Sequence, residues 1–177
     1  MPSHILLLLA SVALSFVQTS VPGTLKFSPP QGWQPRDPSS TMRVAEFVLP
    51  ARDAGKANAE LVIYFFGGSG GSVDANIQRW LGQMQQPDGR ATADIAVRDS
   101  RTINGLKVSL LDVSGTYVAE VRPGATEKHN SPGYRMRTAV VETARGPYYL
   151  KLVGPSETVA VWNSSVDQFL SSLSFSQ

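Results

Sequence analysis

A serine flanked by glycines is the clearest candidate for chemistry in this chain. Residues 67–71 read Gly-Gly-Ser-Gly-Gly, which places Ser69 in a G-x-S-x-G pentapeptide between an apolar run and an amphipathic run. This motif forms the strand-to-helix turn that carries the nucleophilic serine of α/β-hydrolases. Outside the first twenty residues the chain has a single histidine, His129, which is the candidate general base. The pattern raises the hypothesis of a small serine hydrolase that uses Ser69 and His129.

The surrounding sequence argues against this hypothesis. In a nucleophile elbow the helix begins directly after the serine, whereas Gly70, Gly71 and the helix-capping Ser72 intervene here. The glycines also leave the loop loose, and a catalytic oxygen must be held to within roughly half an ångström. An α/β-hydrolase needs a parallel sheet, but this chain contains hairpin signals. We therefore expect no catalytic residue and interpret the glycines as the point where a strand reverses into a helix.

Other site chemistries have little support in the sequence. The glycine loop lacks the Gly-Lys-Ser/Thr ending of a phosphate-binding loop, and Asp74 would face the anion. One mature histidine, no cysteine and scattered carboxylates predict no metal site, and no cofactor is expected. The long connection at 119–133 could contact a ligand through its tip or could be a solvated loop. The tip residues are Arg122, Glu127, Lys128 and His129.

Charge and composition restrict the partners. The 177 residues include 16 Lys and Arg against 14 Asp and Glu, a net charge of +2. Because the basic residues are scattered and form no stripe, nucleic acid is not an expected partner. The expected partner is an unknown protein or a small ligand. The chain has no cysteine, so its core must form without disulfides.

The N-terminus has the features of an export signal. The first twenty residues contain no Lys, Arg, Asp or Glu, and residues 5–17 are almost entirely apolar. This run is shorter than the roughly 20 residues of a membrane-spanning helix. We predict a secretory signal at 1–21, a single domain at 22–177, and a periplasmic or extracellular location with no membrane span after cleavage. The alternatives are an uncleaved anchor or a misassigned start.

Strand signals dominate the remaining chain, with a helical pattern in two places. Strands are predicted at 24–27, 42–49, 60–66, 95–103, 106–118, 135–144 and 148–154. Asn104-Gly105 predicts a hairpin turn, because both of its positions need positive φ. Amphipathic helices are predicted at 72–86 and 155–175, with Trp80 and Trp162 on their apolar faces. Short turns between strands require antiparallel pairing, so the expected fold is α+β: a mostly antiparallel sheet covered by two amphipathic helices.

This order resembles the PsbP-like α/β sandwich family of extrinsic photosystem proteins and related bacterial envelope proteins. The carrying features are "KFSPPQGW", the central "ELVIYFFGG", the helix "NIQRWLGQM", the Asn-Gly hairpin and the terminal "FLSSLSF". Trp33 in the first of these is expected to be either a lid on the core edge or an exposed aromatic contact. The resemblance implies an accessory or binding role and supplies no catalytic residues.

Together these features predict an exported, non-enzymatic accessory or binding protein of the bacterial cell envelope. The alternative from another class is the serine hydrolase based on Ser69 and His129. A structural domain without a dedicated ligand is a further possibility that the sequence does not separate from the first.

Overall fold

The computed structural model describes residues 23–176. The predicted signal at 1–21 therefore lies outside the described residues.

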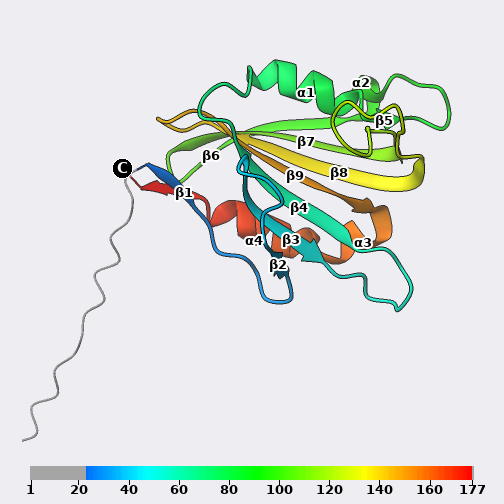
Figure 1. Cartoon of the computed structure of the whole chain (residues 1–177), viewed down its shortest axis with the longest axis horizontal. Helices are drawn as coiled ribbons and strands as arrows, with labels where there is room; N and C mark the ends of the chain where they lie inside the picture. Colours follow the sequence, from blue (N-terminus) through cyan, green and yellow to red (C-terminus); the bar gives the residue numbers. More distant parts are fainter. Residues whose placement is uncertain (1–22, 177) are drawn as a thin grey trace, which may run out of the picture.

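An antiparallel sheet of 8 strands forms the centre of the fold (Figure 1). Its order is β2-β3-β4-β9-β8-β7-β5, and β6 pairs with the part of β7 that β5 leaves free. The strands are β2 (Gln34–Arg36), β3 (Arg43–Leu49), β4 (Ala59–Phe65), β5 (Met84–Gln85), β6 (Val97–Ile103), β7 (Leu106–Tyr117), β8 (Ser131–Val141) and β9 (Tyr148–Pro155). The predicted α+β class with a mostly antiparallel sheet is confirmed.

Two local predictions about the sheet are also confirmed. Asn104 and Gly105 turn β6 into β7 with φ angles of 47° and 81°. Both values lie in the left-handed region, which asparagine and glycine tolerate best. β4, predicted to be a buried central strand, pairs with β3 on one side and β9 on the other.

The first helix is shorter than its apolar spacing predicts. α1 (Val73–Leu81) begins where Ser72 Oγ accepts a hydrogen bond of 3.1 Å from the Ala75 amide. The chain leaves the helix at Gly82, and the following residues pair with β7 as β5. The prediction of a helix through residue 86 is wrong, because strand pairing there replaces the last helical turn. Trp80 is buried under α1 as predicted.

The C-terminal segment also departs from a single predicted helix. It consists of α3 (Ser156–Val161) and α4 (Asn163–Ser171), followed by strand β10 (Ser174–Ser176), which pairs with β1 (Thr24–Lys26). Trp162 separates the helices at φ −101° and ψ 7°. Its indole Nε1 donates to the Pro50 carbonyl at 2.8 Å, which holds the ring at the edge of the core. Trp162 is therefore only partly buried, in contrast to the prediction.

Helices cover both faces of the sheet, and each face has its own apolar cluster. α1 lies on one face, while α3 and α4 lie on the other (Figure 1). The short helix α2 (Thr92–Ile95) precedes β6. Trp33 is buried against Phe47 and Phe169 in the α4 cluster, so it closes the edge of the core and is not an exposed contact.

Candidate functional site

The structure separates Ser69 from His129. Ser69 follows the end of β4 at Phe65, which pairs with Tyr148 and through it with Val141 at the end of β8. His129 precedes the beginning of β8. The 11 residues of that strand place the two side chains roughly 30 Å apart along the sheet. No direct hydrogen bond can join them.

Each of the two residues has a local partner. The Ser69 hydroxyl donates to the Phe66 carbonyl at 2.6 Å. The His129 ring lies 5.1 Å from the Tyr117 ring, and its backbone amide donates to the Ala119 carbonyl at 2.8 Å. Within residues 23–176, nothing connects Ser69 to a general base, so the geometry of a serine nucleophile is not formed.

Replacing Ser69 with Ala should leave the protein nearly unchanged. The hydroxyl closes an exposed turn, where such a hydrogen bond contributes at most about 1 kcal/mol. Urea denaturation should give a free energy of unfolding within about 1 kcal/mol of wild type. A fluorophosphonate probe should label neither protein. Labelling of Ser69 that is lost in His129→Ala would instead support the hydrolase.

The glycines around Ser69 serve the chain reversal. Gly67, Gly68 and Gly71 have φ angles of 61°, 89° and 85°. A Cβ on Gly70 would lie 2.5 Å from the Tyr149 ring, whose hydroxyl donates to the Gly71 carbonyl at 2.9 Å. The loop thus needs glycine for its backbone shape and for its contact with β9, which agrees with the interpretation from sequence.

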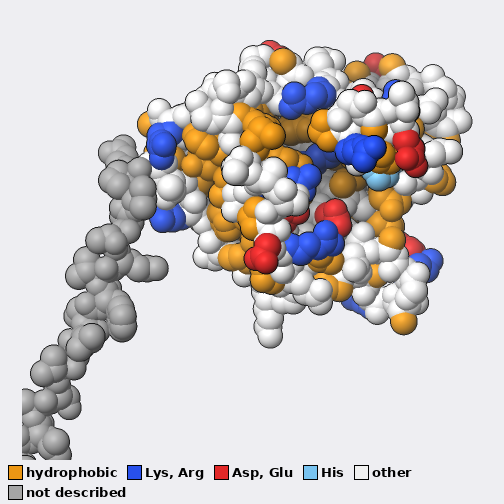
Figure 2. All heavy atoms as spheres, in the orientation of Figure 1, with side chains coloured by type: hydrophobic (Ala, Val, Ile, Leu, Met, Phe, Trp, Pro, Cys, Tyr) orange, Lys and Arg blue, Asp and Glu red, His pale blue; other side chains and the backbone are white. Residues whose placement is uncertain are grey.

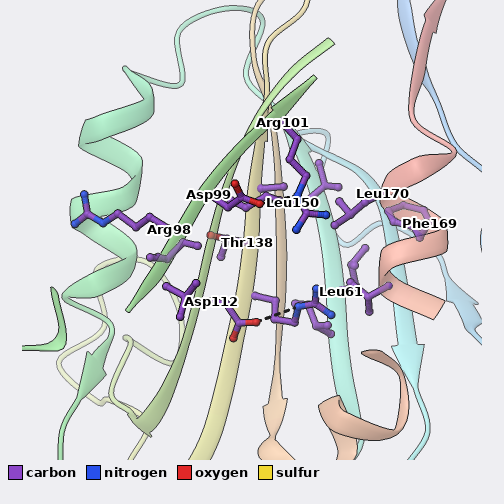
Figure 3. A pocket seen from close by; sticks show the side chains of 16 residues that line it. Leu61, Arg98, Asp99, Arg101, Asp112, Thr138, Leu150, Phe169 and Leu170 are labelled. Carbon is purple, nitrogen blue, oxygen red and sulfur yellow. Dashed lines mark hydrogen bonds and ion pairs between the residues drawn. The ribbon is translucent and has the colours of Figure 1, made fainter. Parts of the chain in front are cut away.

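A candidate binding site is a cavity of about 280 Å³ between the sheet and α4 (Figure 3). Its floor comes from neighbouring strands, because Leu110, Ala139 and Leu150 are register partners on β7, β8 and β9. Leu61 and Leu152 extend the floor, and Val166, Phe169 and Leu170 of α4 form one wall. These side chains are all apolar, so the interior favours an apolar ligand.

Charged side chains surround the apolar interior. Val97, Asp99 and Arg101 of β6 lie beside the cavity and are exposed. Asp99 and Arg101 form an ion pair of 2.6 Å, and this hydrogen bond lowers the pKa of Asp99. Figure 3 shows Arg98 extending away from the cavity, in accord with its register opposite Leu111 on the other face. The mouth is therefore polar and the interior apolar.

Arg137 connects α4 to the sheet next to the cavity. Its guanidinium lies 2.7 Å from Asp167 of α4 and 3.4 Å from Asp112 of β7, and it donates to the Asn163 side chain at 3.3 Å. Arg135 makes the closer pair with Asp112, at 2.6 Å, and this hydrogen bond raises the pKa of Arg135. The network fixes the position of α4 and thereby the width of the cavity.

The sequence did not identify these residues as a site. Leu110, Ala139 and Leu150 come from strands far apart in the chain, and each one alone is an ordinary core residue. Arg135 and Arg137 have the alternate spacing of residues on one strand face, which from the sequence alone is equally typical of a solvated surface. In the structure both guanidiniums are partly buried and paired.

The proposed ligand tip at 119–133 is a small folded loop. Glu120 and Lys128 form an isolated β-bridge, and β8 already begins at Ser131. Arg122, Glu127 and Lys128 are exposed, whereas His129 is partly buried against Tyr117. The loop does not reach the cavity under α4.

Neither metal ligation nor membrane crossing is indicated in the part of the chain that the structure describes. Among residues 23–176, no cluster of three or more His, Cys, Asp or Glu residues is placed to hold a metal ion. No helix within the same range has the length and hydropathy needed to cross a membrane.

Comparisons with known proteins return similar folds and no family. No family model matches the chain, and no curated protein matches its sequence. A solved protein of unknown function from Pseudomonas aeruginosa, PA94, is 18% identical, with 86% of this chain and 96% of that chain covered at a TM-score of 0.47. LpqN of Mycobacterium tuberculosis, which is involved in cell envelope biogenesis, is 11% identical, with 88% and 84% covered at a TM-score of 0.50. The likeness to LpqN is one of fold.

Proposed function

We propose that this protein is an exported, non-enzymatic binding protein of the bacterial cell envelope that holds the acyl chain of an amphiphile under α4. The observation that carries the proposal is the cavity of about 280 Å³, with its apolar interior and charged mouth. This volume is near the lower end of the range for small-ligand pockets, which suits one slender chain better than a bulky ligand.

The envelope part of the proposal rests on two supports. The uncharged, apolar N-terminus has the pattern of an export signal. LpqN, which shares the fold, is involved in cell envelope biogenesis. The resemblance to the PsbP-like family favours the same kind of accessory role, and membership in that family is part of the proposal.

The energetics fit a chain with a polar head. Each methylene that moves from water into the apolar interior contributes about 0.8 kcal/mol. The head group of the amphiphile would remain beside Asp99 and Arg101 at the exposed mouth. Because the mouth carries both signs of charge, chain length should determine the affinity more strongly than head-group charge.

Filling the cavity should abolish binding. Ala139 is buried on the cavity floor, so Ala139→Phe places a ring where the chain would lie. Calorimetric titration with dodecanoate below its micelle concentration should show an affinity at least about tenfold weaker than wild type, the equivalent of about two lost methylenes. Ala160→Phe is the matched control, because Ala160 is exposed on α3 outside the cavity.

Two further titrations distinguish the contribution of the acyl chain to binding from that of the head group. Dodecyl maltoside should bind and compete with dodecanoate, while propionate should not bind. If propionate bound as well as dodecanoate, or if Ala139→Phe kept wild-type affinity while folded, an acyl-chain site under α4 would be wrong.

A further inference from the structure

A second unusual group of side chains lies on the opposite face of the sheet, under α1. Lys151, in the middle of β9, is flanked on this face by Val62 of β4 and Thr138 of β8. Its Nζ donates to Gln83 Oε1 at 2.6 Å and to the Tyr117 hydroxyl at 2.9 Å. The sheet lies between this group and the cavity under α4, and Thr138 of β8, which flanks Lys151, also lines that cavity.

The Lys151 ammonium has no carboxylate counter-ion. Its hydrogen-bond partners are neutral, and no Asp or Glu in residues 23–176 lies within salt-bridge distance. Two carboxylates on this face are already paired, Glu46 with Arg43 at 3.1 Å and Glu60 with Arg36 at 2.8 Å. A largely buried cation without a counter-ion is costly, and this cost is relieved when an anion binds.

The surroundings of Lys151 and Tyr117 shift the pKa values of both side chains. Burial, followed by the charges of Arg79 and Arg43, lowers the pKa of Lys151 to about 8. Burial raises the pKa of Tyr117 to about 12. At neutral pH the lysine is therefore still mostly charged, and the tyrosine keeps its proton. Strongly shifted groups of this kind are concentrated at functional sites.

Three hydrogen-bond donors around Lys151 have capacity for a further acceptor. An ammonium group has three donors, and Lys151 uses two of them on protein atoms. The Tyr117 oxygen accepts from Lys151, while its own hydrogen has no acceptor within the described range. Thr138 Oγ1, which flanks Lys151, is likewise buried without a partner in that range. All three groups can therefore donate a further hydrogen bond to the oxygens of a bound anion.

Aromatic rings line the space beside these donors. The Tyr117 ring is parallel to the Tyr134 ring at 6.2 Å, and Tyr64 is stacked on Phe66 at 5.9 Å. Figure 2 shows this face hollowed below α1, with hydrophobic side chains among basic ones. The rings can contact the body of a ligand whose charged end reaches Lys151.

We propose that the α1 face of the sheet binds a carboxylate or phosphate group, whose oxygens accept hydrogen bonds from Lys151 Nζ and the Tyr117 hydroxyl. The aromatic rings contact the part of the ligand that carries this group. Ligands with an anionic group on a flat or apolar body form the expected class. Binding should weaken as the pH rises above about 8, because deprotonation of Lys151 removes the positive charge.

The test is an NMR titration of Lys151 in the full-length protein with benzoate or inorganic phosphate as the probe. Bound anion should raise the pKa of Lys151 above about 8 in a saturable manner. Other charged or titratable groups also face Lys151 and Tyr117: Arg79 of α1, Arg43 and Glu46 of β3, Glu60 and Tyr64 of β4, and His129 of the loop between β7 and β8. Exposed Lys107 on β7 is the internal control and should not shift.

Variants distinguish the site from general charge effects. Tyr117→Phe keeps the ring and removes the donor, so it should weaken binding several-fold without unfolding the protein. Lys151→Met should remove binding, while Lys107→Met should retain it. A response to benzoate alone assigns a carboxylate site, and a response to phosphate alone assigns a phosphate site. No saturable shift with either anion, or unchanged binding by Tyr117→Phe, would overturn the proposal.

Discussion

Replacing Phe169 with Ala is expected to cost about 3–5 kcal/mol of unfolding free energy, the usual range for removing a large buried aromatic side chain. Phe169 is fully buried, and its ring lies 5.0 Å from Trp33, 5.5 Å from Phe27 and 6.4 Å from Phe47. These contacts hold α4 on the sheet. Removing the ring leaves the three aromatic neighbours facing a void, because the rigid strands below cannot collapse into it.

Urea denaturation measures this effect directly. The midpoint for Phe169→Ala should fall while the slope stays close to wild type, since the two proteins expose similar surface on unfolding. Gln168→Ala, at the neighbouring exposed position of α4, should change the free energy by no more than about 0.5 kcal/mol. A loss below about 1 kcal/mol for Phe169→Ala would contradict the packing of α4 described above.

Even a single methyl group at Gly154 is expected to destabilise the fold. A Cβ there would lie 2.5 Å from the Ala59 Cβ and 2.6 Å from the Ala59 Cα. Ala59 is fully buried at the start of β4, so β4 and β9 must separate to admit the methyl group. Gly154→Ala should lower the free energy of unfolding by about 1–3 kcal/mol, the range for overpacking a core.

Gly82→Ala is the matched control for this second variant. Gly82 has an α-helical φ of −66° at the end of α1, and a Cβ there would contact no atom closer than 3.5 Å. A methyl group at such a position restricts the unfolded chain and should raise stability by about 0.4–1 kcal/mol. If Gly154→Ala and Gly82→Ala had the same effect on stability, the close approach of β4 and β9 would be refuted.

Local signals made the sheet predictable from sequence. Asn104 and Gly105 favour a turn through their own backbone preferences. The apolar run of β4 indicates that this strand is buried on both faces of the sheet. The helix ends were harder, because apolar spacing continues past them. Met84 matches the helical pattern but belongs to β5, and Trp162 matches it while separating α3 from α4. In both places tertiary pairing or packing overrides the local period.

The candidate sites were not predictable in the same way. The cavity depends on register, which brings Leu110, Ala139 and Leu150 side by side. The sequence gives only a weak indication of a site at Lys151, which is a charged residue within the otherwise apolar run of β9. Its lack of a counter-ion follows only from the three-dimensional arrangement. Conversely, Ser69 and His129 had the most recognisable residue types, yet the structure places them at opposite ends of the sheet.

The acyl-chain site under α4 is tested most directly by where a bound chain lies. An isotope-filtered NOE spectrum of carbon-13-labelled protein with unlabelled dodecanoate reports contacts between chain methylenes and protein methyl groups. We expect contacts with Leu110, Leu150 and Leu170, which line the cavity. Saturated binding with contacts only to residues on the α1 face, such as Val62, would contradict it.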